Sequence, residues 1–474
     1  MTALDQLAEP TAWADLGALL HEWVPRQRWF GAKASVDIAT EIVDTAVLPG
    51  TGHGGVDVLV VLLAVEHGTE RDHYHVPLVA AEDDAERAIG ACRQVTLGDA
   101  CADPAGARTL AAATLRTRAQ PTTVGSALDG RPLIEQELSP ADLPRWIDAE
   151  QSNSAAVLGE RWFLKVFRRV GDGPNPDVEL TAVLTEAGQD TVPTQAGSLA
   201  WGTGEEAPSL ALLTVYMPDA ADAWEQAVAD AQAIARGAEP PHGIAEDIAD
   251  LGGVVGELHA TLADRLGAHP VGPETLALWA HGMESQLERV LSDARASADP
   301  LVAEVVSRSE EVRGHLRALS TLGDAGRTLR IHGDLHLGQL LRRLDGGWLV
   351  LDFEGEPARP LEQRRRPQSA MRDVAGMLRS FDYAAAFQAG EPGPTLAAWR
   401  DRMAAAFLTG YEAIAPATLL PVDPADRSAL RAAFTLDKAV YELGYELNNR
   451  PDWVSIPAGG ILRVLRGAAA EVSR

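Results

Sequence analysis

The chain has 474 residues, 46% of them hydrophobic, which is enough for two or three domains with separate cores. Its 41 Lys and Arg against 68 Asp and Glu give a formal net charge of −27, which opposes binding to nucleic-acid phosphates. No apolar run approaches the roughly eighteen residues that span a membrane, and the first six residues are acidic rather than signal-like. We therefore expect a cytoplasmic protein without a membrane partner, whose two cysteines, Cys92 and Cys101, are reduced structural thiols.

Residues 1–90 alternate apolar strands with polar turns and predict a β-rich N-terminal domain. The clearest strands cover residues 56–65 and 73–78. His73 and His75 alternate along the second strand without a third metal ligand nearby, so we predict solvent-facing strand residues rather than a metal site. Residues near 90–130 are rich in Ala, Thr and Arg and are expected to be helical.

The next segment contains one cation in an apolar strand pattern. Lys165 lies within the strand predicted over residues 161–167, and a helix with two acids in its first turn begins at Pro176. Just before the strand, residues 150–159 join a polar turn to an apolar strand. Two interpretations of that turn stay open, a phosphate-covering hairpin and an ordinary one.

An apolar strand over residues 210–217 ends at Pro218, the usual form of a hinge between two lobes. Beyond it, residues 244–266 and 300–319 have apolar positions three and four apart, which is typical of helices. We therefore expect three parts: residues 1–90, residues 91–217, and a mainly helical part over residues 218–474.

Residues 330–339 (RIHGDLHLGQ), with Asp352 thirteen residues after Gln339, hold the polar groups that phosphoryl transfer requires. A kinase needs an Asp to accept the proton of the attacking hydroxyl, an amide about five residues later for Mg²⁺, and a second metal-binding carboxylate. Asp334, Gln339 and Asp352 fit these roles in order. A hairpin turning at residues 345–347 is expected to bring the carboxylates together. An isolated His-Gly-Asp is usually a polar loop or a helix cap, but this arrangement favours an ATP-dependent kinase.

The remaining nucleotide contacts follow from that hypothesis. A kinase lysine that binds the ATP phosphates is ion-paired to an acid on the following helix, so we predict Lys165 and Glu179 as this pair. Backbone groups near Val215 and Met217 are expected to bind adenine. For Asp222 two roles stay open: contact with the ribose, or the start of the next helix.

A helix predicted over residues 434–449 presents acids and tyrosines side by side. A protonated amino sugar would need a carboxylate for its ammonium group and aromatic or amide groups for its hydroxyls. The alternative is an ordinary surface pair between Lys438 and Glu442, with the tyrosines packed inside. The residues predicted to contact the acceptor are Asp334, His336, Asp437, Tyr441, Glu442, Glu446, Asn449 and Arg450.

Two basic clusters, residues 342–343 and 364–366, are predicted to form ion pairs. We also expect Arg372 and Asp373 to brace the loop that follows Asp352.

Several long motifs carry a family resemblance. They are Glu-Gln-Ser-Asn at 150–153, Leu-Lys-Val-Phe-Arg-Arg at 164–169, HGDLHLGQ at 332–339, Asp-Phe-Glu-Gly-Glu-Pro at 352–357 and RDVAGMLRSF at 372–381. Together with Pro-Arg-Gln-Arg-Trp-Phe-Gly at 25–31 and Arg-Pro-Asp-Trp at 450–453, they resemble the actinobacterial maltokinases over most of the chain. The resemblance implies a bilobal α+β fold of the eukaryotic protein kinase type, related to aminoglycoside phosphotransferases. It further implies an N-terminal β-rich cap domain, a mainly helical C-lobe and a sugar acceptor.

The maltokinase-like proteins include a branch that resembles glucosamine kinases. Residues 191–197 and 216–220, and the two amides before Arg450, depart from the pattern expected of a maltokinase. We therefore predict a kinase that converts glucosamine to glucosamine 6-phosphate with ATP as co-substrate and Mg²⁺ as cofactor. One alternative is a maltokinase that makes maltose 1-phosphate for α-glucan synthesis, and another is a catalytically silent, nucleotide-binding regulator. The sequence points to no protein partner.

Overall fold

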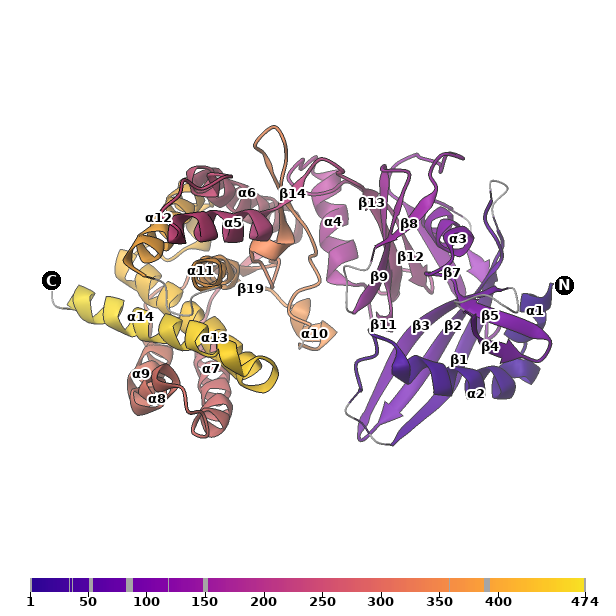
Figure 1. The fold of residues 1–474 in the computed structure, drawn as a ribbon, viewed down its shortest axis with the longest axis horizontal. Coiled ribbons are helices and arrows are strands. Elements are labelled where there is room, and N and C mark those ends of the chain that lie inside the picture. Colours follow the sequence, from indigo (N-terminus) through magenta and orange to yellow (C-terminus); the bar gives the residue numbers. More distant parts are fainter. Residues whose placement is uncertain are drawn as a thin grey trace. The chain divides into compact units, whose positions relative to one another are not determined.

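The computed structural model describes residues 2–33, 35, 37–50, 54–81, 88–117, 119–147, 152–357, 359–387 and 393–472. The chain divides into two compact units (Figure 1). Unit 1 contains residues Met1–Glu186 and Pro193–Pro218, and unit 2 contains residues Ala187–Val192 and Asp219–Arg474. The start of the Glu-Gln-Ser-Asn motif, residues 150–151, lies outside the described residues.

In its described residues, unit 1 consists of two antiparallel sheets with four α-helices. Its elements are α1 (Ala3–Ala8), α2 (Trp13–Trp23), β1 (Ile38–Leu48), β2 (Val58–His67), β3 (Glu70–Ala80), β4 (Ala88–Cys92), β5 (Val95–Asp99), α3 (Pro104–Thr114), β6 (Gln120–Pro121), β7 (Ala127–Pro132), β8 (Pro144–Ile147), β9 (Asn153–Leu158), β10 (Trp162–Phe167), β11 (Arg169–Val170), α4 (Pro176–Glu186), β12 (Gln195–Trp201) and β13 (Ser209–Val215). The first sheet has the order β1-β2-β3-β5-β4, with β11 paired to β3, and the second has the order β6-β7-β12-β13-β10-β9-β8.

The first sheet is buried on both faces, which explains the continuous apolar run of β2. Successive side chains of a strand point to opposite faces. Leu59 and Val61 accordingly join the core under α1 and α2, whereas Val58 and Val60 join the core that the sheet shares with α3 and the second sheet. Figure 1 shows α1 and α2 against this sheet.

The prediction of solvent-facing histidines on β3 is wrong for His75. Its side chain is fully buried, because it faces the second sheet, at the backbone of Phe167 and Leu210. Its Nδ1 lies 3.3 Å from the carbonyl oxygen of Phe167. Burial, and then the charge of Arg168, lower the pKa of His75 to about 3.

The expectation of a helical segment near residues 90–130 is correct only for α3 (Pro104–Thr114). The flanking residues form β5 and β7, which pair with β3 and β12. Local residue composition favoured a helix here, but pairing with distant strands decided the structure. Intrinsic propensities are weak, and tertiary contacts often outweigh them.

Unit 2 is mainly helical, with two small three-stranded sheets of order β14-β17-β18 and β15-β16-β19. Its elements are β14 (Ala221–Asp222), α5 (Ala223–Ala235), α6 (Ile248–Leu266), β15 (Ala268–Pro270), α7 (Pro273–Ala294), α8 (Pro300–Ser307), α9 (Ser309–Ala318), β16 (Arg327–Leu329), β17 (Leu340–Arg342), β18 (Trp348–Val350), α10 (Leu361–Arg364), β19 (Gln368–Ser369), α11 (Met371–Ala386), α12 (Pro394–Ile414), α13 (Pro424–Asn449) and α14 (Ser455–Val472).

Helix α11 is the centre of unit 2, and α5, α12, α13 and α14 pack around it (Figure 1). Its buried residues include Val374, Met377 and Phe381, together with the polar Asp373 and Arg379. A helix buried on most sides should be apolar, so its buried charges need partners.

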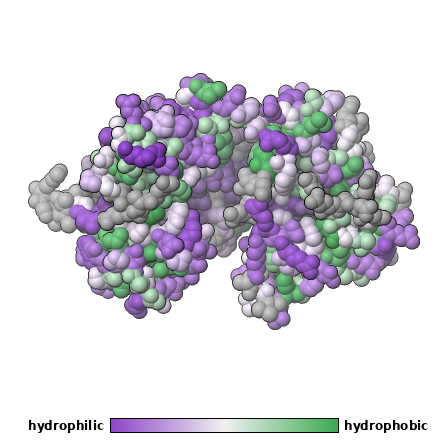
Figure 2. Space-filling model, viewed as in Figure 1, coloured by the Kyte–Doolittle hydropathy of each residue, from purple (hydrophilic) through white to green (hydrophobic). Residues whose placement is uncertain are grey.

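Figure 2 shows a surface on which hydrophilic residues predominate and hydrophobic residues form small groups. Across the residues that the structure describes, no helix combines the length and the apolar character needed to cross a membrane.

Helices α6 and α12 approach each other closely through glycines. A Cβ at Gly410 of α12 would overlap the backbone of Ala249, and one at Gly252 of α6 would overlap the backbone of Phe407. By contrast, a Cβ at Gly282 of α7 would meet nothing within 4 Å.

We expect Gly410→Ala to destabilise the protein by about 1–3 kcal/mol, because the added methyl group must push two packed backbones apart. The control Gly282→Ala should be neutral or stabilise by roughly 0.4–1 kcal/mol, because alanine favours an exposed helix interior. Urea unfolding midpoints measure both, and equal midpoints for the two variants would contradict the close packing of α6 and α12.

Candidate active site

The loop before Asp334 is bound to helix α11 through a buried carboxylate. Asp373 Oδ2 accepts from the backbone N–H of His332 at 2.9 Å, and its Oδ1 accepts from that of Gly333 at 2.8 Å. His259 Nε2 lies 3.0 Å from the same Oδ2, and its Nδ1 lies 3.0 Å from the Tyr411 hydroxyl. Burial alone would raise the pKa of Asp373, but the hydrogen bond and charge of His259 outweigh it and lower the pKa.

Two further positions on the same face of α11 receive the loop. A Cβ at Gly376 would overlap the carbonyl oxygen of Leu335, so only glycine lets the loop pass this close. One turn later, Ser380 Oγ accepts from the N–H of Leu337 at 3.0 Å. The three α11 residues, at spacings of three and four, hold the loop along one helix face.

Arg372 and Asp373 were predicted to brace the loop that follows Asp352, and the structure agrees only for Arg372. Asp373 binds the segment before Asp334, not the loop after Asp352, because its carboxylate faces the loop backbone at His332 and Gly333. Arg372 does face the later loop, with Nη1 at 3.9 Å from Glu356 and Nη2 at 3.7 Å from Asp437.

The predicted hairpin is confirmed: β17 and β18 are antiparallel, and the turn contains Gly346 with a positive φ of 87°. His332 Nε2 lies 2.8 Å from the carbonyl oxygen of Leu351, which links the Asp334 loop to the residue before Asp352. Gln339 Nε2 donates to Asp352 Oδ2 at 3.0 Å. The hairpin therefore places the two predicted metal ligands in contact.

These groups fit a magnesium ion. Mg²⁺ prefers hard oxygen ligands, and the carboxylates of Asp352 and Glu354 have oxygens within 4.8 Å of one another, beside the Gln339 amide. Asp352 also has a φ of 61°, which is uncommon outside glycine and typical of positions held strained at functional sites.

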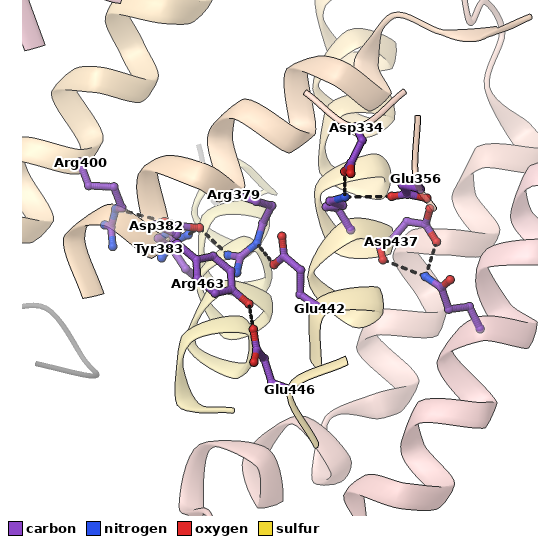
Figure 3. Close-up of polar contacts among 12 residues, drawn as sticks. Asp334, Glu356, Arg379, Asp382, Tyr383, Arg400, Asp437, Glu442, Glu446 and Arg463 are labelled. Carbon is purple, nitrogen blue, oxygen red and sulfur yellow. Dashed lines mark hydrogen bonds and ion pairs between the residues drawn. The ribbon is translucent and has the colours of Figure 1, made fainter. Parts of the chain in front are cut away.

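Asp334 is bound by a lysine from helix α13. Lys438 Nζ donates to Asp334 Oδ1 and to Glu356 Oε1, both at 2.9 Å (Figure 3). Burial alone would lower the pKa of Lys438, but Asp334, Glu356 and Glu442 raise it, so the side chain stays charged. The alternative of an ordinary surface pair between Lys438 and Glu442 is therefore wrong, because Lys438 binds Asp334 and Glu356 instead.

Glu356 is a member of this cluster that the sequence analysis quoted in a motif without giving it a role. Its side chain is 3% exposed and contacts three cations, Lys438, Arg359 and Arg372. Burial alone would raise the pKa of Glu356, but these cations lower it to about 2. The repeated acid in Asp-Phe-Glu-Gly-Glu-Pro was the available signal for it.

The predicted acceptor acids of α13 already have polar partners; Asp437 and Glu446 are buried, and Glu442 is half-buried. Glu442 Oε2 accepts from Arg379 Nε at 2.7 Å, and Glu446 Oε1 accepts from the Tyr383 hydroxyl at 3.0 Å (Figure 3). Burial raises the pKa of both carboxyl groups. Asp437 accepts from Gln286 Nε2 at 2.9 Å.

The other predicted acceptor residues differ in their surroundings. The ring of Tyr441 lies 5.2 Å from Lys438 Nζ, beside the cluster around Asp334. His336 is near Asp334 and Lys438, and burial lowers its pKa. Asn449 is exposed and donates to the Tyr445 carbonyl oxygen at 2.8 Å, and Arg450 lies 4.5 Å over the Trp453 ring.

In unit 1, Lys165 is buried on β10 and its Nζ donates to Asp177 Oδ2 at 3.0 Å. Asp177 is on α4, two residues before the predicted partner Glu179, and the sequence analysis gave it no role. The strand and the helix are thus where the sequence placed them, and the lysine does pair with an acid of the first turn.

Some of the residues predicted to contact the nucleoside already have hydrogen-bond partners within the protein. The N–H of Val215 donates to the Thr194 carbonyl oxygen at 2.9 Å. Among the described residues, the N–H of Met217 has no such partner. Asp222 accepts from the N–H of Glu225 at 2.9 Å as the N-cap of α5, so the structure supports its role as a helix start.

The basic clusters form ion pairs, as predicted. Arg343 pairs with Asp345 at 2.5 Å, Arg364 lies 3.8 Å from Glu354, and Arg366 pairs with Glu362.

The chain is similar to proteins of one family. Residues 23–114 match the maltokinase N-terminal cap domain. A glucosamine kinase of Streptacidiphilus jiangxiensis is 30% identical over 330 residues, which is 67% of this chain and 73% of that protein. A glucosamine kinase of Mycolicibacterium smegmatis is 31% identical over 330 residues, covering 68% of this chain and 79% of that protein. This chain belongs to the glucosamine kinase and maltokinase family.

Solved structures agree. A glucosamine kinase in complex with glucosamine, ADP and inorganic phosphate has a TM-score of 0.68 at 25% identity, over 90% of this chain and 94% of that chain. A second glucosamine kinase structure has a TM-score of 0.71 at 24% identity, over 95% and 99%. The predicted fold is therefore confirmed: a kinase-like, aminoglycoside phosphotransferase-like fold with an N-terminal β-rich cap. The chain is a member of a family of ATP-dependent sugar kinases.

The charge cluster around Glu356 makes a prediction for this sugar kinase. Because its pKa is about 2 in the folded state and near 4.5 when unfolded, the stabilisation is complete above pH 4.5 and is lost as the pH falls towards 2. The shift corresponds to about 3 kcal/mol. We expect Glu356→Gln to be less stable than the wild type at pH 7, with a difference that shrinks at pH 3.

Denaturant unfolding across this pH range provides the measurement. The control is Glu362→Gln, because Glu362 is 78% exposed and its surface pair with Arg366 contributes little. A stability difference for Glu356→Gln that is independent of pH would contradict the assignment.

Proposed function

We propose that this sugar kinase transfers the γ-phosphate of ATP to glucosamine and makes glucosamine 6-phosphate. The observation that carries the proposal is the similarity to two glucosamine kinases. The match extends over more than two thirds of the length of each of them. The solved relative that binds glucosamine and ADP supports the same substrates.

The charge distribution of α13 also favours a cationic acceptor. Asp437 and Glu442 flank Lys438 in sequence, and burial raises the pKa of both carboxyl groups. A carboxyl group of raised pKa gains from any added positive charge, since a nearby cation stabilises its ionised form. The ammonium group of glucosamine would supply such a charge, whereas maltose would not.

In the proposed reaction, Asp334 accepts the proton of the sugar hydroxyl as that oxygen attacks the γ-phosphorus in line with the leaving ADP oxygen. Lys438 orients Asp334 by its 2.9 Å contact. Lys165, held by Asp177, binds the ATP phosphates, with Glu179 on the same helix turn. Gln339 and Asp352 would hold Mg²⁺, which neutralises phosphate charge when bound. Adenine would bind at backbone groups near Val215 and Met217.

Maltose is the second candidate acceptor, because residues 23–114 match a cap domain described for maltokinases. The two candidates differ in acceptor and product, so one assay separates them.

The test is ATP consumption with Mg²⁺ against glucosamine, glucose, maltose, N-acetylglucosamine and kanamycin, with the product position determined by NMR. We expect glucosamine turnover that gives a 6-phosphate. Maltose turnover that gives a 1-phosphate would replace the proposal, and ATP binding without transfer to any sugar would support the silent regulator.

Asp334→Asn should lower kcat by about 10²–10⁴, the usual contribution of a positioned base, while ATP affinity stays within a few-fold. The matched control is Asp345→Asn in the β17–β18 turn, where the side chain contacts Arg343 and the turn backbone. Its kcat should equal that of the wild type. An unchanged kcat for Asp334→Asn would exclude Asp334 as the base.

A further inference from the structure

A half-open cavity of about 180 Å³ in unit 2 is lined by α11, α12 and α14. The charged residues that line it are Asp382, Arg400, Arg463 and Arg466. Figure 3 draws Arg400, Asp382 and Arg463 on one side of Arg379, and Asp334 on the other side. The cavity is thus separate from the cluster around Asp334.

Positive charge exceeds negative charge around this cavity. Three arginines and one aspartate line the cavity, and Arg400 also binds Asp401 at 2.7 Å, so three positive charges against two negative charges leave an excess of one. The carboxylate of Asp382 is shared, because Arg463 pairs with its Oδ2 and Arg400 Nε lies 3.5 Å from its Oδ1. Within the described part of the chain, Arg466 has no ion pair. Burial, and the charges of Arg400 and Arg379, lower the pKa of Arg463.

A fourth guanidinium lies directly behind the cavity wall. Arg379 is fully buried and also pairs with Asp382. Gly460 lines the cavity, and a Cβ there would overlap the Arg379 guanidinium, so only the glycine backbone separates this group from the cavity. Among the described residues, Arg379 Nη2 has no hydrogen-bond partner, and a buried charged donor without one is costly.

We propose that this cavity binds a small phosphate-type dianion, either inorganic phosphate or the phosphate group of a sugar phosphate. Guanidinium groups present planar pairs of donors that match phosphate oxygens, and here they converge from three helices. The negative charge of the ligand would offset the excess positive charge and supply acceptors to the arginines. The acidic surface elsewhere does not prevent this, because salt screens charges beyond about 8 Å.

An anion bound in the cavity would change the contacts of helix α13 through Arg379. An anion that draws Arg400 and Arg463 away from Asp382 leaves this carboxylate to Arg379. Arg379 is then held less strongly by Glu442, which it contacts at 2.7 Å. Glu442 is four residues after Lys438, so the cavity would act as an effector site for the acceptor side of the enzyme. This step rests on the proposed function, whereas anion binding does not.

The experiment measures binding of inorganic phosphate to the full chain by calorimetry, without ATP or Mg²⁺. The variants are Arg463→Gln and Arg466→Gln, and the control is Arg402→Gln, which removes the same charge from an exposed position of α12. We expect the wild type and Arg402→Gln to bind equally, and both α14 variants to bind at least about tenfold more weakly. Because Arg466 is exposed, its replacement should leave the fold intact, as thermal unfolding will verify.

Phosphate bound at the nucleotide site would respond to neither α14 variant, so equal affinity in all four proteins would overturn the proposal. No saturable binding would overturn it as well. Binding of sulfate and of glucosamine 6-phosphate distinguishes a site for free phosphate from a site for a sugar phosphate. Equal affinity for phosphate, sulfate and the sugar phosphate supports a free-anion site, whereas a sugar phosphate that binds tenfold more tightly supports a product site.

A kinetic measurement tests the effector step separately. Phosphate should change the acceptor KM of the wild type and of Arg402→Gln, but not that of Arg463→Gln. An equal change of the acceptor KM in all three proteins would contradict the effector role. The calorimetry result would then decide by itself whether the cavity binds an anion. If no sugar is a substrate, the proposed function fails while calorimetry still tests the cavity.

Discussion

The buried carboxylate of Asp373 is the contact on which the active-site geometry depends. It accepts two backbone N–H groups of the His332–Gly333 segment and faces His259, so the loop cannot move without exposing a desolvated charge. Gly376 and Ser380 continue the contact along α11. The loop that carries Asp334 is thus positioned by the central helix of its unit, and His332 links this loop to the residue before Asp352.

Helix α13 connects the site to the rest of unit 2. One of its faces places Lys438 between Asp334 and Glu356, and the next turn places Glu442 against Arg379 of α11. Since α11 also supplies Asp373, these two helices hold the Asp334 loop through separate contacts. Charges in this region are paired across elements, which explains why buried acids and arginines are so frequent on two helices that pack together.

Much of the site was predictable because its parts are short and local. Strand β10 with Lys165, the helix after Pro176, and the β17–β18 hairpin between Gln339 and Asp352 are where their residue patterns placed them. Errors arose where long-range packing decides burial. His75 was predicted to face solvent, but it is buried against the second sheet. The alternative of a surface pair for Lys438 fails because its partners are over 80 residues away in sequence.

By itself, the sequence determined the family through its resemblance to maltokinases, and that resemblance implied the kinase-like fold with its cap. The order of the candidate catalytic groups followed from motif spacing and turn residues, which are local properties. Only the tertiary structure decided which acidic side chain pairs with which basic side chain. Asp177 lies against Lys165, Glu356 joins the cluster at Asp334, and Asp382 is shared among three arginines. The reason is physical: a charged side chain pairs with whatever group packing brings within a few ångströms, and that neighbour is set by helices and loops distant in sequence.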